Sequence, residues 1–325
     1  MPHGSFTNAF HQFPIVVAIG YAAAIAFFLA RSLRSGARTG IFVLLSVIVL
    51  SSAILLETGN LAIRWVVVGL LIAIFLPHMW DLHLDPARGS RLSFRAYFIF
   101  VGDYAWSVAR VADGYGVDLP FKRRLLDAGK YVAGLGVVTV VTVRVFKVHW
   151  AAYPFLLEHA VKSTCLAALG IWAFQANTAL WRLAGAPAAF FTTKNVLWAY
   201  SPADFWRRWN RPMHRWLLEN IYKPLGGRRN PHLAVLAAFA VSGLLHEYLF
   251  AVTFRCVTGY VTAFFLLHGL AAVLTRRFKP TGWLVLPAAV FTFAFNTTST
   301  LLLLIPVNDR IPLYINEVPK WMHLW

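Results

Sequence analysis

Apolar runs recur along this chain, and short basic segments separate them. The runs span residues 13–30, 41–56, 65–76, 131–145, 155–183, 232–254, 257–275 and 283–305. A helix of about 20 apolar residues crosses the hydrocarbon core of a bilayer, and a shorter one is accommodated by local thinning. Pro77 is expected to end the third run. The pattern predicts an all-α integral membrane protein with about eight transmembrane helices.

The composition agrees with this class. Of the 325 residues, 59% are hydrophobic and 13% are charged, and the mean hydropathy is +0.61. These values exclude a soluble globule with one large core. A net charge of +17 would suit a nucleic-acid partner, but the basic residues lie in loops between the apolar runs, as in cytoplasmic loops of membrane proteins. We therefore predict contact with membrane lipids and no nucleic-acid partner.

Lysine and arginine are distributed unevenly between alternate loops. Residues 31–40, 78–130, 182–232 and 276–279 contain 23 of the 30 basic residues. Because cytoplasmic loops carry the excess of such residues, these four segments are predicted to be cytoplasmic and both termini extracytoplasmic. No heptads, low-complexity tracts or repeats of about 20 to 50 residues occur, so residues 1–325 are predicted to form one transmembrane domain.

Two segments depart from the simple series of spans. Residues 94–111 are aromatic, contain Asp103 and are surrounded by basic residues, so an interfacial or re-entrant helix is predicted there. The run at 155–183 contains Lys162, Gln175 and Asn177. These polar side chains are expected to face protein rather than lipid.

Aromatic and basic side chains concentrate after residue 200. Ser201 followed by Pro202, with Asp204 in the next turn, is typical of a helix start. The helical period then separates two sets of side chains. Trp206, Trp209, Met213, Trp216 and Leu217 fall on one side, and Arg207, Arg208, Arg211 and Arg215 fall on the other.

Two interpretations of this segment are open. One is an interfacial amphipathic helix whose aromatic side chains lie at headgroup depth. The other is a basic cytoplasmic face that binds the phosphates of a soluble acyl carrier such as coenzyme A. Pro212 cannot continue an ordinary helix, so a break is predicted near Arg211. Asn210 either N-caps the second helical piece or takes part in chemistry.

His246 lies inside the apolar run at residues 232–254. At about 1.5 Å per residue it is roughly 21 Å along that helix, within the hydrocarbon layer. A histidine at this depth forms a helix-to-helix hydrogen bond or takes part in chemistry. The adjacent Glu247 favours chemistry, and imidazole is a suitable base for a hydroxyl. For His268 and Asn296, in later runs, a helix-to-helix hydrogen bond and a tunnel lining are equally good explanations.

These residues resemble the signature of the membrane-bound O-acyltransferases. Ser-Pro-Ala-Asp-Phe-Trp-Arg-Arg-Trp at 201–209 and Tyr-Lys-Pro-Leu-Gly-Gly at 222–227 are similar to the bacterial polysaccharide O-acetylases of that family. Asn210 stands where those proteins usually have His, and Leu-His-Glu-Tyr at 245–248 stands where they have Trp-His-Gly. In both respects the chain looks more like the wax synthase-like branch. The resemblance covers residues 201–253.

The resemblance implies a fold with a central tunnel and an acyl-CoA-dependent O-acyltransferase. His246 matches the family's catalytic histidine, which implies a general base. Asn210 matches its second signature polar residue, which implies that it orients the acyl chain or polarises the thioester. Acyl-CoA is the implied co-substrate, with no permanently bound cofactor and no metal. The residues expected to bind it from the cytoplasmic side are Arg207, Arg208, Arg211, Trp206 and Trp209.

Three alternatives for the function follow. The first acceptor is the hydroxyl of a lipid or small apolar alcohol, as in a wax ester synthase. The second is an exported polysaccharide or other glycan that becomes O-acetylated. A polytopic transporter or scaffold would use the same buried polar groups without acyl transfer.

Overall fold

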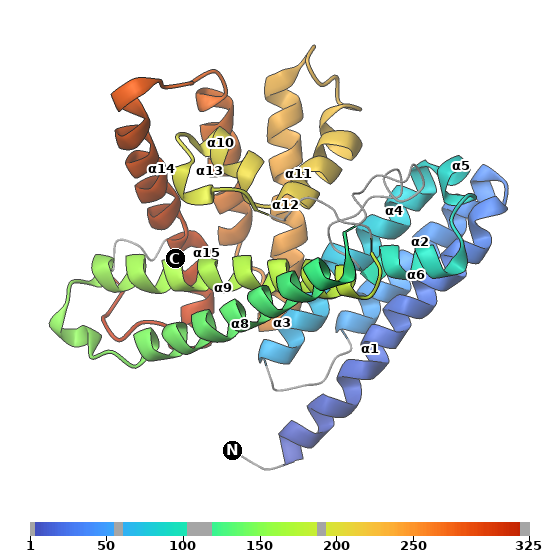
Figure 1. The fold of residues 1–325 in the computed structure, drawn as a ribbon, viewed down its shortest axis with the longest axis horizontal. Coiled ribbons are helices and arrows are strands. Elements are labelled where there is room, and N and C mark those ends of the chain that lie inside the picture. The colour runs from blue at the N-terminus through green and yellow to red at the C-terminus, as the bar shows by residue number, and fades with distance from the viewer. Residues whose placement is uncertain (1–3, 55–60, 103–118, 187–192, 319–325) are drawn as a thin grey trace. The chain divides into compact units, whose positions relative to one another are not determined.

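The computed structural model describes residues 4–54, 61–102, 119–186 and 193–318. Within these ranges the regular structure is entirely helical, which confirms the predicted all-α class (Figure 1). The chain divides into two compact units. The first consists of Met1–Arg124, Leu180–Phe190 and Leu245–Val257, and the second of Leu125–Ala179, Phe191–Leu244 and Thr258–Trp325. The single transmembrane domain over residues 1–325 stays a prediction.

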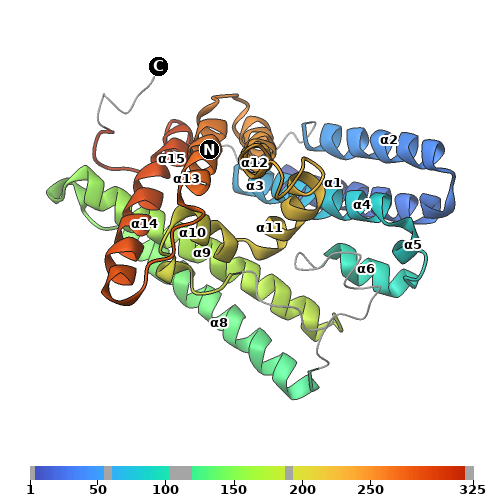
Figure 2. The same ribbon diagram turned by 90° about the horizontal axis from the view of Figure 1, so that it is seen from above.

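The first unit begins with a series of helices. They are α1 Gly4–Leu29, α2 Ser35–Ile54, α3 Leu61–Leu70, the π-helical segment Leu71–Phe75, α4 Leu76–Leu84, α5 Pro86–Gly89 and α6 Phe94–Gly102. Helices α1 and α2 lie side by side (Figure 2). A Cβ atom on Gly20 of α1 would lie 2.7 Å from the Phe75 ring. Glycine therefore permits the close approach of α1 to the π-helical segment.

Aromatic side chains form much of the core of this unit. Phe28 stacks on Tyr97 with ring centroids 4.4 Å apart, and both side chains are buried. The Tyr97 hydroxyl donates a hydrogen bond to the carbonyl of Ala24 at 2.8 Å. The end of α12 belongs to the same unit, and there the Tyr248 hydroxyl donates to the carbonyl of Leu50 in α2 at 2.7 Å. Long-range side-chain bonds to main-chain carbonyls thus tie the helices of this unit together.

The second unit combines long helices with very short ones. They are α8 Phe121–Phe146, α9 Phe155–Leu183, α10 Pro202–Arg208, α11 Arg211–Leu217, the π-helical segment Leu218–Tyr222, α12 Pro231–Phe254, α13 Tyr260–Thr275, α14 Val285–Ser299 and α15 Leu301–Asn308. The start of α8 and the ends of α9 and α12 fall in the first unit. Helices α8 and α9 run side by side (Figures 1 and 2). The Trp172 ring packs on the backbone at Gly134, where a Cβ atom would lie 2.0 Å away.

Large apolar side chains cover the surface of α8. Val137, Val140 and Val141 are 64%, 60% and 49% exposed. Soluble proteins rarely leave such a continuous apolar surface in water. Hydrocarbon chains of lipid are the medium that suits it.

Several helices have the length and composition needed to cross a membrane. Those among the described residues are Pro14–Ser32, Ser35–Ile54, Phe121–Phe146, Pro231–Phe254 and Gly282–Asn308. Tyr260–Thr275 is also apolar but shorter. Helix α9, Phe155–Leu183, has the predicted limits, and its Lys162 and Gln175 are buried as expected. The count of about eight spans and the central tunnel stay predictions.

The helix limits predicted at Pro77 and at residue 131 are wrong. Pro77 does not end the third run, because it occupies the first turn of α4 directly after a π-helical segment, and the helix continues to Leu84. The missing N–H of proline is tolerated in a first turn. The run at 131–145 belongs to a helix that starts at Phe121. Basic residues interrupt the apolar pattern there, although lysine and arginine are good helix formers.

The aromatic segment predicted at residues 94–111 is described only in part. Helix α6 covers Phe94–Gly102, the described part of this segment. Asp103 lies outside the described residues.

Candidate functional site

Helix α10 begins at the predicted residue. The Ser201 hydroxyl accepts a hydrogen bond from the backbone N–H of Asp204 at 3.1 Å, and Pro202 occupies the first helical position. Both features arise from local sequence, since an N-cap hydroxyl and a first-turn proline need no distant partner. The predicted helix start is confirmed.

Asp204 holds the two arginines that follow it. Arg208 Nε lies 2.7 Å from one carboxylate oxygen, and Arg207 Nη2 lies 3.2 Å from the other. Arg208 also donates to the carbonyl of Asn195 at 3.1 Å. The Asp204 side chain is 7% exposed, that of Arg208 26% and that of Arg207 48%. The Arg208 side chain is thus held by contacts within the protein, whereas about half of the Arg207 side chain is exposed at the surface.

Asn210 stands at the break between two helices. Helix α10 ends at Arg208, and α11 starts at Arg211 with Pro212 in its first turn. Asn210 Oδ1 accepts a hydrogen bond from the backbone N–H of Met213 at 3.2 Å, so Asn210 N-caps α11. The predicted break is confirmed, and one face does not continue from α10 into α11. Capping uses the side-chain oxygen of Asn210. Its predicted role toward the acyl group stays a prediction.

The Trp206 indole faces the interior of the second unit. Its ring centroid lies 5.4 Å from that of Phe239 in α12 and 5.7 Å from that of Phe265 in α13. Its Nε1 donates to Nδ1 of His268 at 3.0 Å. Trp206 therefore anchors α10 to α13. Its expected part in binding acyl-CoA stays a prediction.

The other predicted binding residues lie closer to the surface. Trp209 is half-buried and stacks on Phe205 with ring centroids 5.5 Å apart. Arg211 is half-buried and Arg215 is exposed. Burial, reinforced by the charge of Arg207, lowers the pKa of His214 in the same helix. The segment thus presents guanidinium groups and no acidic side chain other than the engaged Asp204 before Glu219.

His246 lies in the C-terminal half of α12 and is half-buried. Gly243, three residues earlier, allows a close helix contact, because a Cβ atom there would lie 3.3 Å from the Cα atom of Thr262 in α13. Residues three apart share a helix face, so His246 and Gly243 lie on the same side of α12. The adjacent Glu247 is 8% exposed.

The predicted site residues fall into both units. Trp206, the arginines and Asn210 come together at the junction of α10 and α11 in the second unit, whereas His246 belongs to the first. Their meeting in one active site stays a prediction.

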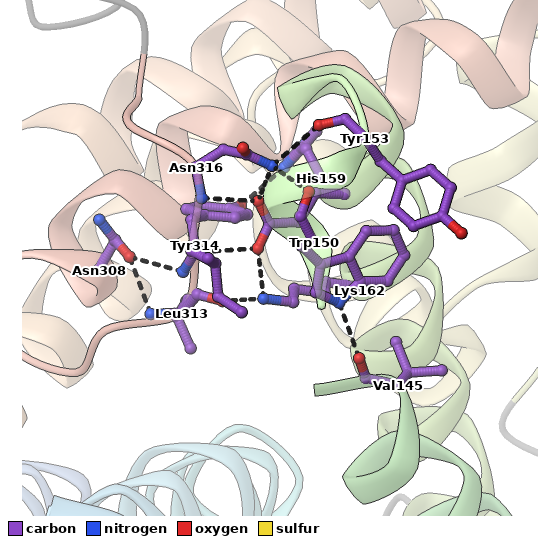
Figure 3. A network of polar contacts seen from close by, with 11 residues as sticks. Val145, Trp150, Tyr153, His159, Lys162, Asn308, Leu313, Tyr314 and Asn316 are labelled. Atoms are coloured by element: carbon purple, nitrogen blue, oxygen red, sulfur yellow. Dashed lines mark hydrogen bonds and ion pairs between the residues drawn. The ribbon is translucent and has the colours of Figure 1, made fainter. Parts of the chain in front are cut away.

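A buried ionic cluster in the second unit was not predicted from the sequence. Glu158 and Lys162, 0% and 2% exposed, form an ion pair on adjacent turns of α9. The Glu158 carboxylate also accepts the backbone N–H groups of Ile315 and Asn316 at 2.7 and 3.1 Å. Lys162 Nζ donates to the carbonyl of Leu313 at 2.5 Å (Figure 3). The cluster thus fastens the segment after α15 to α9.

His159 extends this cluster. Its Nδ1 lies 2.7 Å from the Tyr314 hydroxyl and its Nε2 lies 2.7 Å from the carbonyl of Thr297. A carbonyl only accepts, so the ring proton is on Nε2, and Nδ1 accepts from Tyr314. With both nitrogens engaged, His159 is a structural residue. Only its distant partners reveal this role, because no local sequence pattern predicts them.

Comparison with known protein families links this region to a described group. Residues 164–301 match the family model of the membrane-bound O-acyltransferases. The match contains Trp206, Asn210, His246 and His268. The ionic cluster at Glu158 lies outside it.

Individual relatives are similar over short segments. Diacylglycerol O-acyltransferase 1 of Arabidopsis thaliana is 43% identical over 58 residues, which is 18% of this chain and 11% of that protein. Probable long-chain-alcohol O-fatty-acyltransferase 2 of the same plant is 38% identical over 99 residues, covering 27% and 29%. Membrane-bound O-acyltransferase GUP1 of Saccharomyces cerevisiae is 42% identical over 48 residues, covering 15% and 9%. The chain thus spans less than a third of the length of each of these relatives.

Proposed function

We propose that the chain is a membrane-bound O-acyltransferase, a family whose model matches residues 164–301, and that it transfers an acyl group from acyl-CoA to the hydroxyl of a lipid or small apolar alcohol. One observation carries this proposal. The family match at residues 164–301 contains Asn210 and His246 together with the helices that hold them.

In the proposed reaction His246 is the general base. Its imidazole takes the proton of the acceptor hydroxyl while the hydroxyl oxygen attacks the carbonyl carbon of the thioester. The new C–O bond forms, the C–S bond breaks, and the coenzyme A thiolate takes the proton back from the imidazolium. The half-buried position of His246 in an apolar helix supports this role, because a lipid acceptor can reach that depth through the bilayer.

Asn210 is proposed to orient the acyl chain or to polarise the thioester carbonyl. An amide donor aimed at a developing oxyanion stabilises charge in the transition state. The N-cap bond to Met213 supports this role, because it fixes the side chain at the start of α11. Precise placement is what such a donor needs.

The proposed donor contacts are Arg207 and Arg211, with Trp209 beside them. Guanidinium groups bind phosphate oxygens through charge-assisted, often bidentate hydrogen bonds. Arg207 supports the proposal best, because its side chain is about half exposed at 48%. Arg208 is engaged by Asp204 and Asn195, so we assign it to holding the site rather than to the donor.

The acceptor class rests on the relatives. One is named for transfer to long-chain alcohols and another for transfer to diacylglycerol, and both acceptors are hydroxyl-bearing lipids. O-acetylation of an exported glycan is the alternative acceptor. A transporter or scaffold is the outcome if no acyl transfer occurs.

We also propose the arrangement in the membrane. The basic loops and the donor side are cytoplasmic, both termini are extracytoplasmic, and about eight spans surround a central tunnel. The uneven distribution of lysine and arginine between loops supports this orientation.

An acyl-transfer assay tests the proposed function. The purified protein receives labelled acetyl-, octanoyl- and palmitoyl-CoA together with alcohols of graded length, diacylglycerol or a soluble glycan, and mass spectrometry identifies the ester. Ester formation on alcohols or diacylglycerol supports the proposal. Ester formation on the glycan alone identifies the alternative acceptor, and absence of any ester with every pair contradicts an acyltransferase.

A further inference from the structure

We infer that His268 is a positioning residue that holds α10, and with it the Asn210 junction, against α13. The inference rests on the proposed function, because Asn210 is proposed to act on the acyl group. His268 lies in α13 and is 1% exposed. Its hydrogen bonds go to Trp206 and Ser299, so its effect on the reaction would pass through α10.

The hydrogen bonds of His268 define its tautomer. The Trp206 indole nitrogen can only donate, and it lies 3.0 Å from His268 Nδ1, so Nδ1 accepts. The ring proton is then on Nε2, which donates to Ser299 Oγ at 2.7 Å. The Ser299 hydroxyl donates onward to the carbonyl of Asn296 at 2.9 Å. A neutral His268 thus links α10 to α14 through successive hydrogen bonds from Trp206 to His268 and from His268 to Ser299. Both ring nitrogens are engaged, so neither can accept a proton from a substrate.

The Trp206 ring is enclosed as well as bonded. It meets the rings of Phe239 and His268 edge to face, with centroids 5.4 Å apart in each case, and Phe264 lies at 6.3 Å. Edge-to-face contacts fix the orientation of a ring in addition to burying it. The hydrogen bond to His268 therefore fixes the orientation of the Trp206 ring among these aromatic side chains.

These contacts hold α10 against α13, whereas bonds of Arg208 to Asn195 and Lys194 hold only its C-terminal end. Helix α10 has seven residues, and an isolated helix of this length is unstable. Its other recorded bond to α13 runs from the backbone N–H of Ala203 to the Thr275 hydroxyl at 3.3 Å. Asn210 follows Arg208, the last residue of α10, by two positions. A rotation of α10 about its start would therefore displace Asn210.

Three variants separate positioning from packing. His268→Leu removes the acceptor and leaves the Trp206 indole N–H buried without its partner. His268→Asn places an amide oxygen near the position of Nδ1 and keeps an acceptor for Trp206. Ser299→Ala removes only the second bond of His268. We expect His268→Leu to lower kcat per folded molecule by about tenfold or more, with His268→Asn and Ser299→Ala close to wild type.

A double variant tests the alternative that the bond only stabilises the protein. Trp206→Phe with His268→Leu removes donor and acceptor together, so no buried polar group is left unpaired and thermal stability should recover. If His268 positions α10, kcat stays low although stability recovers. Recovery of both kcat and stability would show a purely structural bond and overturn the inference.

A measurement without turnover keeps the inference separate from the proposed function. In a background lacking Cys165 and Cys256, Met213→Cys places a thiol at the half-buried position that Asn210 caps. His268→Leu should raise the rate of maleimide labelling there severalfold, whereas His268→Asn should not. Equal labelling in both variants overturns the inference. If the wild type forms no ester, the proposed function fails, and the labelling comparison still decides whether His268 positions α10.

Discussion

Arg208 pairs with Asp204 through an Nε to carboxylate contact of 2.7 Å, inside the run of arginines that would meet an anionic donor. Asp204 in turn closes the first turn of α10. The same carboxylate contacts Arg207 at 3.2 Å, but the Arg207 side chain is 48% exposed against 26% for Arg208. Neighbouring arginines of one helix therefore differ in exposure, and we propose different roles for them.

Charge reversal should separate these roles. Arg207→Glu and Arg211→Glu should each raise the KM for acyl-CoA more than the KM for the alcohol, because a charge-assisted bond to phosphate contributes about 1.5 to 3 kcal/mol. Arg208→Ala should mainly lower thermal stability, since it leaves Asp204 with one partner fewer. Steady-state kinetics with each substrate varied gives both values. A change in the alcohol KM alone would mean that Arg207 contacts lipid headgroups instead.

The ionic cluster of α9 offers a matched comparison of two lysines. Lys162 and Lys223 each pair with a glutamate one turn earlier, but the first pair is 2% and 0% exposed and the second 58% and 57%. Lys162→Met leaves Glu158 charged and buried, which should cost about 3 to 5 kcal/mol of folding free energy. Lys223→Met should cost less than about 1 kcal/mol. Thermal unfolding in detergent measures both, and equal losses would contradict the structural role of the cluster.

The same variant should also release the chain after α15. Leu313, Ile315 and Asn316 are held through Lys162 and Glu158. Limited proteolysis should therefore cleave Lys162→Met near these residues earlier than it cleaves Lys223→Met.

His214 should make stability depend on pH. Burial, together with the charge of Arg207, lowers the pKa of His214 in the folded protein. The unfolded chain then binds a proton more readily than the folded one, so stability is full above the ordinary pKa of about 6.5 and falls as the pH drops below it. His214→Gln should flatten this decline in unfolding midpoint, whereas His232→Gln, at an exposed position, should not. If the unfolding midpoint of His214→Gln fell with pH as in the wild type, another titratable group would cause the pH dependence.

Labelling in intact cells tests the proposed orientation. Single cysteines at Arg38 and Arg228, in a background lacking Cys165 and Cys256, should react with a membrane-impermeant maleimide only after the cells are opened. Reaction at position 228 from outside would reverse the orientation and place the donor side with it.

Local sequence predicted local structure well. Ser201, Pro202 and Pro212 act within one turn of their own positions, and the helix start and break they predict are both present. The helix end predicted at Pro77 is wrong because Pro77 follows a π-helical segment and lies in the first turn of α4, where its missing N–H is tolerated.

Bonds between distant residues could not be predicted in this way. Trp206 and His268 are 62 positions apart, and Glu158 and Ile315 are 157 apart. An isolated histidine or lysine in an apolar run indicates a buried polar group, but its partner depends on how helices pack. Arg207 and Arg208 likewise differ in how far their side chains are exposed. The helical period places both on the same side of the helix and does not predict this difference.

Turnover of the His246→Ala variant tests the proposed role of His246 most directly. This change removes the proposed proton acceptor and little packing volume, so the protein should still fold and bind acyl-CoA while kcat falls by roughly two to four orders of magnitude. His232→Ala, at the exposed start of the same helix, is the control and should keep wild-type kcat. Asn210→Ala should be intermediate if it acts on the thioester; if it only caps α11, it should lose about 1 kcal/mol of stability and keep its turnover. A folded His246→Ala protein with wild-type kcat would contradict the proposed mechanism.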